Sequence, residues 1–214
     1  MTLSKQARKS RHSRVLEERS GTWGSSSQDF LHLANLLFEK SVAHAKQTDG
    51  NCSVYVLAGI PILFSALRCL LIELNAGMYS GLRNKNGLAE LTVASNDIEI
   101  ILRRYSIPAD LKERLIFLRE IRNEIIHPAH RPEEKNGTPA YLLPLRHAGL
   151  LQSTGSDADY IWISQLQSHK LLTWAFATVR ETVEILLSTH TIASFMANGL
   201  RKSYSRYEDI NRDL

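Results

Sequence analysis

The chain has 214 residues, of which 43% are hydrophobic and 22% are charged, a composition typical of one globular domain with a sizeable core. The composition excludes a disulfide-rich scaffold, because the chain has only two cysteines, Cys52 and Cys69. We therefore expect a reduced, cytoplasmic protein.

The net charge of +4 is concentrated at the N-terminus. Residues 1–20 contain six basic and two acidic residues, and six minus two gives +4, so the rest of the chain is neutral. The pI of about 9.1 therefore does not indicate a basic nucleic-acid-binding surface on the folded part. Residues 1–26 are interpreted as a flexible basic arm, either simply solvated or making non-specific phosphate contacts.

The first core helix is predicted over residues 28–47, with Ser27 or Asp29 as its cap. Apolar residues recur along it every three or four positions, which is typical of a helix with one buried face. The turn at 48–51 then leads into a second helix.

The second helix, over residues 53–75, is the most apolar segment of the chain. Its composition raises the possibility of a membrane span, but Pro61, Arg68 and Glu73 interrupt it. We expect a central helix that is buried on several sides, and no membrane association. A connector, a short helix over 88–94 and a further helix from about 95 to 105 follow.

A helix that starts near Pro108 and ends near His127 carries the main motif. Pro128 favours an end at His127, because a proline disfavours helical geometry in the residue before it. On a helical wheel the apolar residues form one arc, made of Leu111, Leu115, Leu118, Ile121, Ile125 and Ile126. Arg122 falls near the middle of that arc, where a charge is costly unless it is paired or needed by a partner.

Beyond the motif, residues 128–159 are predicted to be a long loop. Four of the six prolines lie in 128–144, with a possible short strand at 140–143. A last long helix is expected from about 160 to 188, with an extension to 198 as the alternative end. Residues 199–214 are expected to be a frayed polar tail. The folded domain is thus predicted to span 27–198.

The motif Arg122-Asn123-Glu124-Ile125-Ile126-His127, closing an apolar helix before Pro128, resembles the signature of HEPN domains. These are all-helical domains, and many are metal-independent RNases of toxin, antiphage and RNA-processing systems. The resemblance implies an all-α bundle of about five or six helices, with the long loop after the motif helix. It also implies a homodimer with the site at the interface, and an antitoxin or nucleotidyltransferase as a possible partner.

The residues of the motif suit RNA cleavage at the chemical level. Histidine transfers protons near neutral pH, and the arginine fork fits the equatorial phosphate oxygens, so His127 and Arg122 are the predicted catalytic residues. Asn123 is four residues before His127 and could orient the imidazole or contact substrate. Glu73 and Glu124 are possible supporting residues, either orienting Arg122 for phosphate or merely pairing with it.

One chain carries one copy of the motif, and so one motif arginine and one motif histidine. A symmetric dimer facing through the apolar arc would provide two of each. We expect an endoribonuclease that acts on tRNA or mRNA without metal or other cofactor and leaves 2′,3′-cyclic phosphate ends. A toxin or antiphage defence effector is the biological role that the resemblance suggests. The alternative is a non-catalytic HEPN-like dimerisation or RNA/nucleotide-binding module. In that case Arg122 pairs with an acidic side chain and His127 caps the helix.

Overall fold

The described part of the chain is all-helical. The structure, a computed structural model, describes residues 26–48, 52–75, 102–127, 140–152 and 162–212. Within these ranges there are helices and no strands, and the only β-type pairing is an isolated antiparallel bridge between Cys52 and Ser168. The all-helical class predicted from the sequence is confirmed for this part of the chain.

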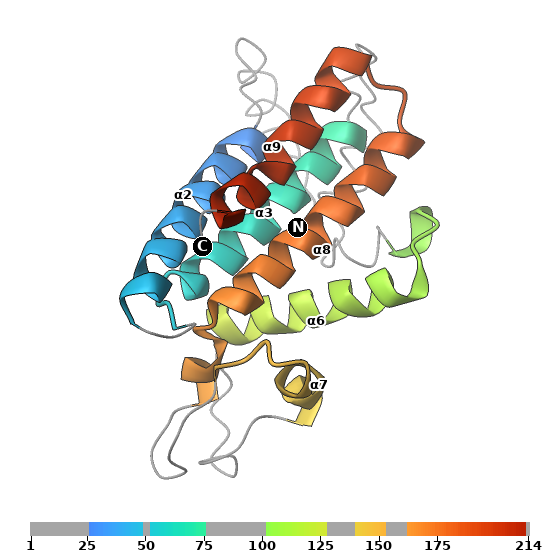
Figure 1. Cartoon of the computed structure of the whole chain (residues 1–214). Coiled ribbons are helices and arrows are strands. Elements are labelled where there is room, and N and C mark those ends of the chain that lie inside the picture. Colours follow the sequence, from blue (N-terminus) through green and yellow to red (C-terminus); the bar gives the residue numbers. More distant parts are fainter. Residues whose placement is uncertain (1–25, 49–51, 76–101, 128–139, 153–161, 213–214) are drawn as a thin grey trace, which may run out of the picture.

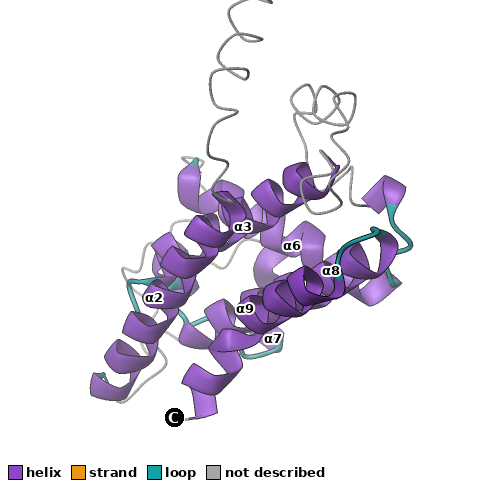
Figure 2. Ribbon diagram, turned by 90° about the horizontal axis from the view of Figure 1, so that it is seen from above, coloured by secondary structure: helices purple, strands orange, loops and turns teal. Residues whose placement is uncertain are grey.

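Four long helices form a ring around one core. They are α2 (Ser26–Gln47), α3 (Val56–Asn75), α8 (His169–Thr189) and α9 (Ser194–Arg212). Successive helices of the ring pack on one another in the order α2, α3, α8, α9 and back to α2, and α2 also makes a smaller contact with α8 across the ring. Figures 1 and 2 show them running along a common direction, with α2 at one edge of the bundle.

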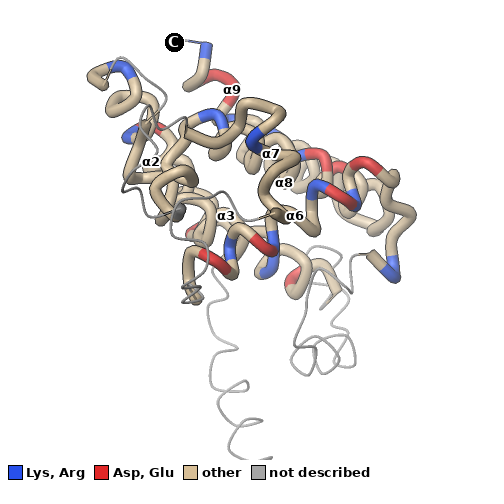
Figure 3. The backbone as a smooth tube through the Cα atoms, turned by 90° about the horizontal axis from the view of Figure 1, so that it is seen from below, with Lys and Arg blue, Asp and Glu red and all other residues tan. Residues whose placement is uncertain are grey.

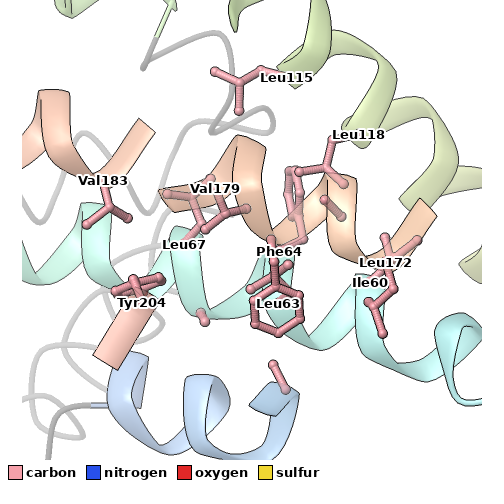
Figure 4. Close-up of a cluster of buried hydrophobic side chains, with 14 of the residues drawn as sticks. Ile60, Leu63, Phe64, Leu67, Leu115, Leu118, Leu172, Val179, Val183 and Tyr204 are labelled. Atoms are coloured by element: carbon pink, nitrogen blue, oxygen red, sulfur yellow. The ribbon is translucent and has the colours of Figure 1, made fainter. Parts of the chain in front are cut away.

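Helix α3 contributes most of the core. Its fully buried side chains include Ile60, Leu63 and Leu67, which meet Leu172 and Val179 of α8 (Figure 4). Among the described helices, α3 alone is long and apolar enough to cross a membrane, and half of that stretch is buried inside the structure. Packing against three neighbouring helices accounts for its apolar composition, as the sequence predicted for a central helix.

Helix α6 (Ala109–Ile126) lies across the outside of this ring, on α3 and α8 (Figure 1). Pro108 directly precedes it with φ −54° and ψ 147°, so the helix starts one residue after the predicted proline. Figure 4 shows Leu115 and Leu118 of α6 pointing toward α3 and α8, and both side chains are fully buried.

The strand predicted at 140–143 is wrong. The chain there forms a 3-10 turn, η2 (Ala140–Leu142), followed by the short helix α7 (Leu143–His147). Pro144 lies in the first turn of α7, where its fixed φ suits a helix and its missing N–H is not needed. Part of the predicted loop 128–159 is therefore helical.

The prediction of a frayed tail over 199–214 is also wrong, because α9 continues to Arg212. Leu200, Tyr204 and Tyr207 are buried in the core and hold α9 in place.

The helix predicted from 160 is in fact a 3-10 segment, η3 (Trp162–Leu166), and then α8, which is capped by the Ser168 hydroxyl. The chain leaves helical geometry at His190, so α8 and α9 are separate helices.

The capping prediction for the first helix needs correction. Helix α2 begins at Ser26, and Ser27 lies within its first turn. The Ser27 hydroxyl donates to Glu73 Oε2 at 2.5 Å, which ties the first turn of α2 to α3. Of the arm predicted over 1–26, Ser26 belongs to α2 and residues 1–25 lie outside the described residues. The helix predicted over 88–94, most of the helix over 95–105 and residues 128–139 of the loop also lie outside them.

Candidate functional site

The motif helix ends where the sequence predicted. His127 is the C-cap of α6, with φ −128° and ψ 65°, and its backbone N–H donates to the carbonyl of Asn123 at 2.7 Å. The residue is exposed. Its imidazole has no hydrogen-bond partner among the described residues, and it stands at the C-terminus of α6.

The apolar arc of α6 faces the chain's own core. Leu111, Leu115, Leu118 and Ile121 are at most 2% exposed within a single chain. The expectation that this arc meets a partner subunit is therefore wrong for these residues. Exposure increases only at the end of the arc, where Ile125 is half-buried and Ile126 is 40% exposed.

Arg122 is half-buried at this end of α6, and its guanidinium contacts an aromatic ring and a side-chain amide. Its guanidinium carbon lies 5.9 Å from the centre of the Phe64 ring of α3, a cation–π contact. Its Nη1 donates to Asn123 Oδ1 at 3.0 Å. Within the described part of the chain, no carboxylate is within ion-pair distance of this guanidinium.

Asn123 therefore contacts Arg122 rather than the imidazole. Its side-chain oxygen is occupied by the guanidinium, and its backbone carbonyl holds the His127 N–H. The three motif residues are thus linked through Asn123, which positions the arginine with its side chain and the helix end with its backbone.

The two possible supporting carboxylates lie elsewhere. Glu73 accepts hydrogen bonds from the backbone N–H of Ser27, at 2.9 Å, and from the Ser27 hydroxyl, so it holds the start of α2. It is nine residues along α3 from Phe64, or about 13 Å at 1.5 Å per residue. Glu124 is buried, and two residues along a helix place it on the opposite side from Arg122.

Several other arginines, unlike Arg122, form ion pairs with acidic side chains. Arg114 contacts Glu181 and Asp110, Arg180 contacts Glu208, and Arg201 contacts Glu184. On α6 itself, Arg119 contacts Glu120 at 2.7 Å. Figure 3 shows basic and acidic segments interspersed along the helices, with neither sign gathered into one broad face. Within the described helices, Arg122 is therefore a local feature and not part of a large basic surface.

Phe64 is a site residue that sequence reasoning missed. It sits in the apolar run of α3, and nothing in that run distinguishes it from its neighbours. Its role follows only from the crossing of α6 over α3, which brings its ring under the guanidinium.

The site has the elements of anion recognition and proton transfer. The guanidinium can offer its remaining N–H groups to a phosphate, and an exposed imidazole can exchange protons near neutral pH. In the described ranges, no group of three or more His, Cys, Asp or Glu side chains could hold a metal ion. No protein-family model, no curated protein and no solved structure matches this chain.

Proposed function

We propose that this protein is a metal-independent endoribonuclease of HEPN type that works as a homodimer, with Arg122 and His127 at its site. One observation carries the proposal. A half-buried guanidinium has a neutral amide and an aromatic ring as its contacts, and it lies on the same helix end as an exposed histidine. A positive charge held in this way is available for a phosphate.

The proposed reaction is an internal transfer at one phosphodiester. A base takes the proton of the 2′-hydroxyl, the 2′-oxygen bonds to phosphorus, and the bond to the 5′-oxygen breaks. An acid returns a proton to that leaving oxygen, which gives a 2′,3′-cyclic phosphate and a 5′-hydroxyl. His127 serves the proton transfers, and Arg122 stabilises the equatorial oxygens of the phosphorane.

The need for both a base and an acid favours two copies of the chain. A single chain provides one histidine at this position, and a two-fold axis near the end of α6 would bring a second one. Because the inner arc is used by the core, this contact must involve the exposed end of α6, where Ile126 is adjacent to His127.

A non-catalytic RNA- or nucleotide-binding module is the second candidate. The observation that favours it is the His127 ring itself, which has no side chain orienting it among the described residues. A general base is usually held by a third group, so an unheld imidazole suits binding better than catalysis. A toxin or defence role depends on the first candidate, and so does an antitoxin or nucleotidyltransferase partner. Growth arrest on expression is the test.

The test compares purified wild type, Arg122→Ala and Arg122→Lys on total tRNA and on mRNA in EDTA. We expect wild type to cut, and Arg122→Ala to cut roughly 10²- to 10³-fold more slowly, because a preorganised charge is removed. Arg122→Lys keeps the charge but loses the fork, and we expect it to recover only part of the rate. Arg119→Ala is the matched control, because Arg119 lies on the same helix but has a carboxylate partner.

Mass in solution and thermal unfolding are recorded for every variant. Binding of RNA without cleavage, weakened by Arg122→Ala, would favour the binding module. If wild type neither cuts nor binds RNA while Arg122→Ala unfolds more readily, the motif is structural and the proposal fails.

A further inference from the structure

A second surface, on α2, has a pattern of its own. Every third or fourth residue on the outer side of the helix is exposed, and together these residues form one row along its length. The row consists of Ser26, Asp29, Leu33, Leu36, Lys40, Ala43 and Gln47. Alternating steps of three and four residues define a seam that a second helix can follow, as in coiled coils.

The centre of this row is apolar although it faces outward. Leu33 is 42% exposed and Leu36 is 40% exposed, and Phe30 beside them is 38% exposed. Helix α2 lies at an edge of the bundle (Figure 2), and its opposite face is the one that packs on α3 and α9. Three large apolar side chains at helical spacing form a patch rather than scattered exposure.

The charges around this centre are arranged symmetrically. Asp29 lies four residues before Leu33, and Lys40 lies four residues after Leu36. In an antiparallel pair of α2 helices, Leu33 of one copy is level with Leu36 of the other, and Asp29 is level with Lys40. Within the described ranges, neither Asp29 nor Lys40 has an ion-pair partner in the single chain.

We propose that a second copy of this chain docks on the α2 row in an antiparallel arrangement, joined by the leucines and by two Asp29–Lys40 pairs. A two-fold interface uses the same patch on both subunits, so the patch must be complementary to itself. The α2 row meets that condition, because an antiparallel pair brings leucine level with leucine and Asp29 level with Lys40. Asp29 and Lys40 stand at equal distances from the two leucines. Such equal spacing is needed for pairing with a second copy of α2, and it would not be needed for binding a different protein.

This interface is separate from the proposed nuclease site. Helix α6 packs on α3 and α8, whereas the α2 row lies on the exposed side of α2, opposite its contacts with α3, α8 and α9. The proposal therefore stands whether or not the chain cuts RNA. A chain with both two-fold contacts would assemble beyond a dimer.

One pair of helices is smaller than a standard protein interface, so the association should depend on concentration. The experiment measures the mass of the full chain by light scattering from about 1 µM to about 100 µM, a range that covers weak dimers. We expect the mass of wild type to rise across this range. Asp29→Lys alone and Lys40→Asp alone should each weaken the α2 association at least tenfold, because each places like charges opposite one another.

The double variant Asp29→Lys with Lys40→Asp restores opposite charges and should associate like wild type. The two single variants should also bind each other when mixed. This is measured by capture of an untagged Lys40→Asp chain on a tagged Asp29→Lys chain. Untagged Asp29→Lys on the same tagged chain is the reference, because any association through α6 would appear equally in both captures. Lys202→Asp, an exposed charge change on α9, is the control for net charge.

The proposal is overturned if wild type keeps the mass of one chain at every concentration. It is also overturned if the single variants associate like wild type, or if the mixed pair is captured no better than the reference pair. Cleavage of RNA is measured on the same samples, and it can fail without changing these results.

Discussion

Two histidines at different places in the bundle show opposite uses of the same side chain. His169, the first residue of α8, is buried, and both of its ring nitrogens have contacts. Its Nδ1 lies 2.9 Å from the Ser41 hydroxyl of α2, and its Nε2 lies 3.4 Å from Asn211 Oδ1 of α9. His127, the cap of α6, is exposed, and its ring has no hydrogen-bond partner in the described part of the chain.

Burial decides the state of the first ring. Loss of solvent lowers the pKa of His169, so the ring is neutral at pH 7. Because Asn211 Oδ1 can only accept, Nε2 carries the proton and the Ser41 hydroxyl donates to Nδ1. The ring also packs on Phe38, with centroids 4.9 Å apart. His169 thus joins three helices, and no freedom is left for chemistry.

The two histidines therefore have different expected roles, His169 in stability and His127 in activity. Side chains that are buried and fully bonded should affect stability, and exposed side chains without partners should affect chemistry. The same contrast holds for the arginines, since Arg201 has its carboxylate partner and Arg122 has none among the described residues.

The largest effect on stability is expected for His169→Ala. Truncation removes the ring from a buried site and leaves the Ser41 hydroxyl without its acceptor. We expect a loss of about 3 kcal/mol in the free energy of unfolding, measured with urea. Cleavage per folded molecule should not change, and a loss of cleavage without a loss of stability would contradict the division of roles.

Acid should weaken the fold through the same ring. Burial lowers the pKa values of His169 and His190 below the ordinary value of 6.5. Above about pH 6.5 both rings are neutral in the folded and the unfolded chain, so their contribution to stability is complete. As the pH falls below 6.5, the unfolded chain binds protons first, and stability is lost until the folded pKa values are reached.

The measurement is the urea midpoint between about pH 7.5 and pH 5.5, where each ring contributes at most about 1.4 kcal/mol per pH unit. His169→Gln should flatten the slope, and His147→Ala, which changes an exposed histidine of α7, should keep it. An unchanged slope in His169→Gln would show that this ring does not control the acid response.

The smallest effect is expected for Arg201→Ala. The guanidinium contacts Glu184 at 2.8 Å, but both side chains are 41% exposed. Exposed ion pairs contribute little, so we expect a loss of at most about 1 kcal/mol in the free energy of unfolding. A loss as large as that of His169→Ala would mean that surface pairing holds α9 more strongly than core packing does.

Part of this arrangement could be read from the sequence. Apolar spacing predicts α2, α3 and α6 to within a few residues, and it also predicts the buried face of α6. Pro128 predicts where α6 ends. Helix α9 was missed because its core residues Leu200, Tyr204 and Tyr207 are thinly spread in a polar segment, although their spacing of four and three residues is helical. The polar composition of this segment favours a tail more strongly than three apolar residues at helical spacing favour a helix.

The setting of Arg122 could not be read in the same way. The sequence offered Glu73 as a partner, because both residues lie on neighbouring apolar helices. The level at which α6 crosses α3 decides that Phe64, and not Glu73, lies under the guanidinium. Such a crossing depends on the packing of whole helices, which single-residue patterns do not specify.

The most direct test of the central claim compares His127→Ala with His147→Ala, two exposed histidines of which only the first caps the motif helix. Both are incubated with tRNA in EDTA, and the products are examined for 2′,3′-cyclic phosphate ends. We expect wild type and His147→Ala to form these ends. His127→Ala should form them about 10²- to 10⁴-fold more slowly, while keeping the stability of wild type. Equal rates in the two variants, or no cyclic phosphate from wild type, would contradict it.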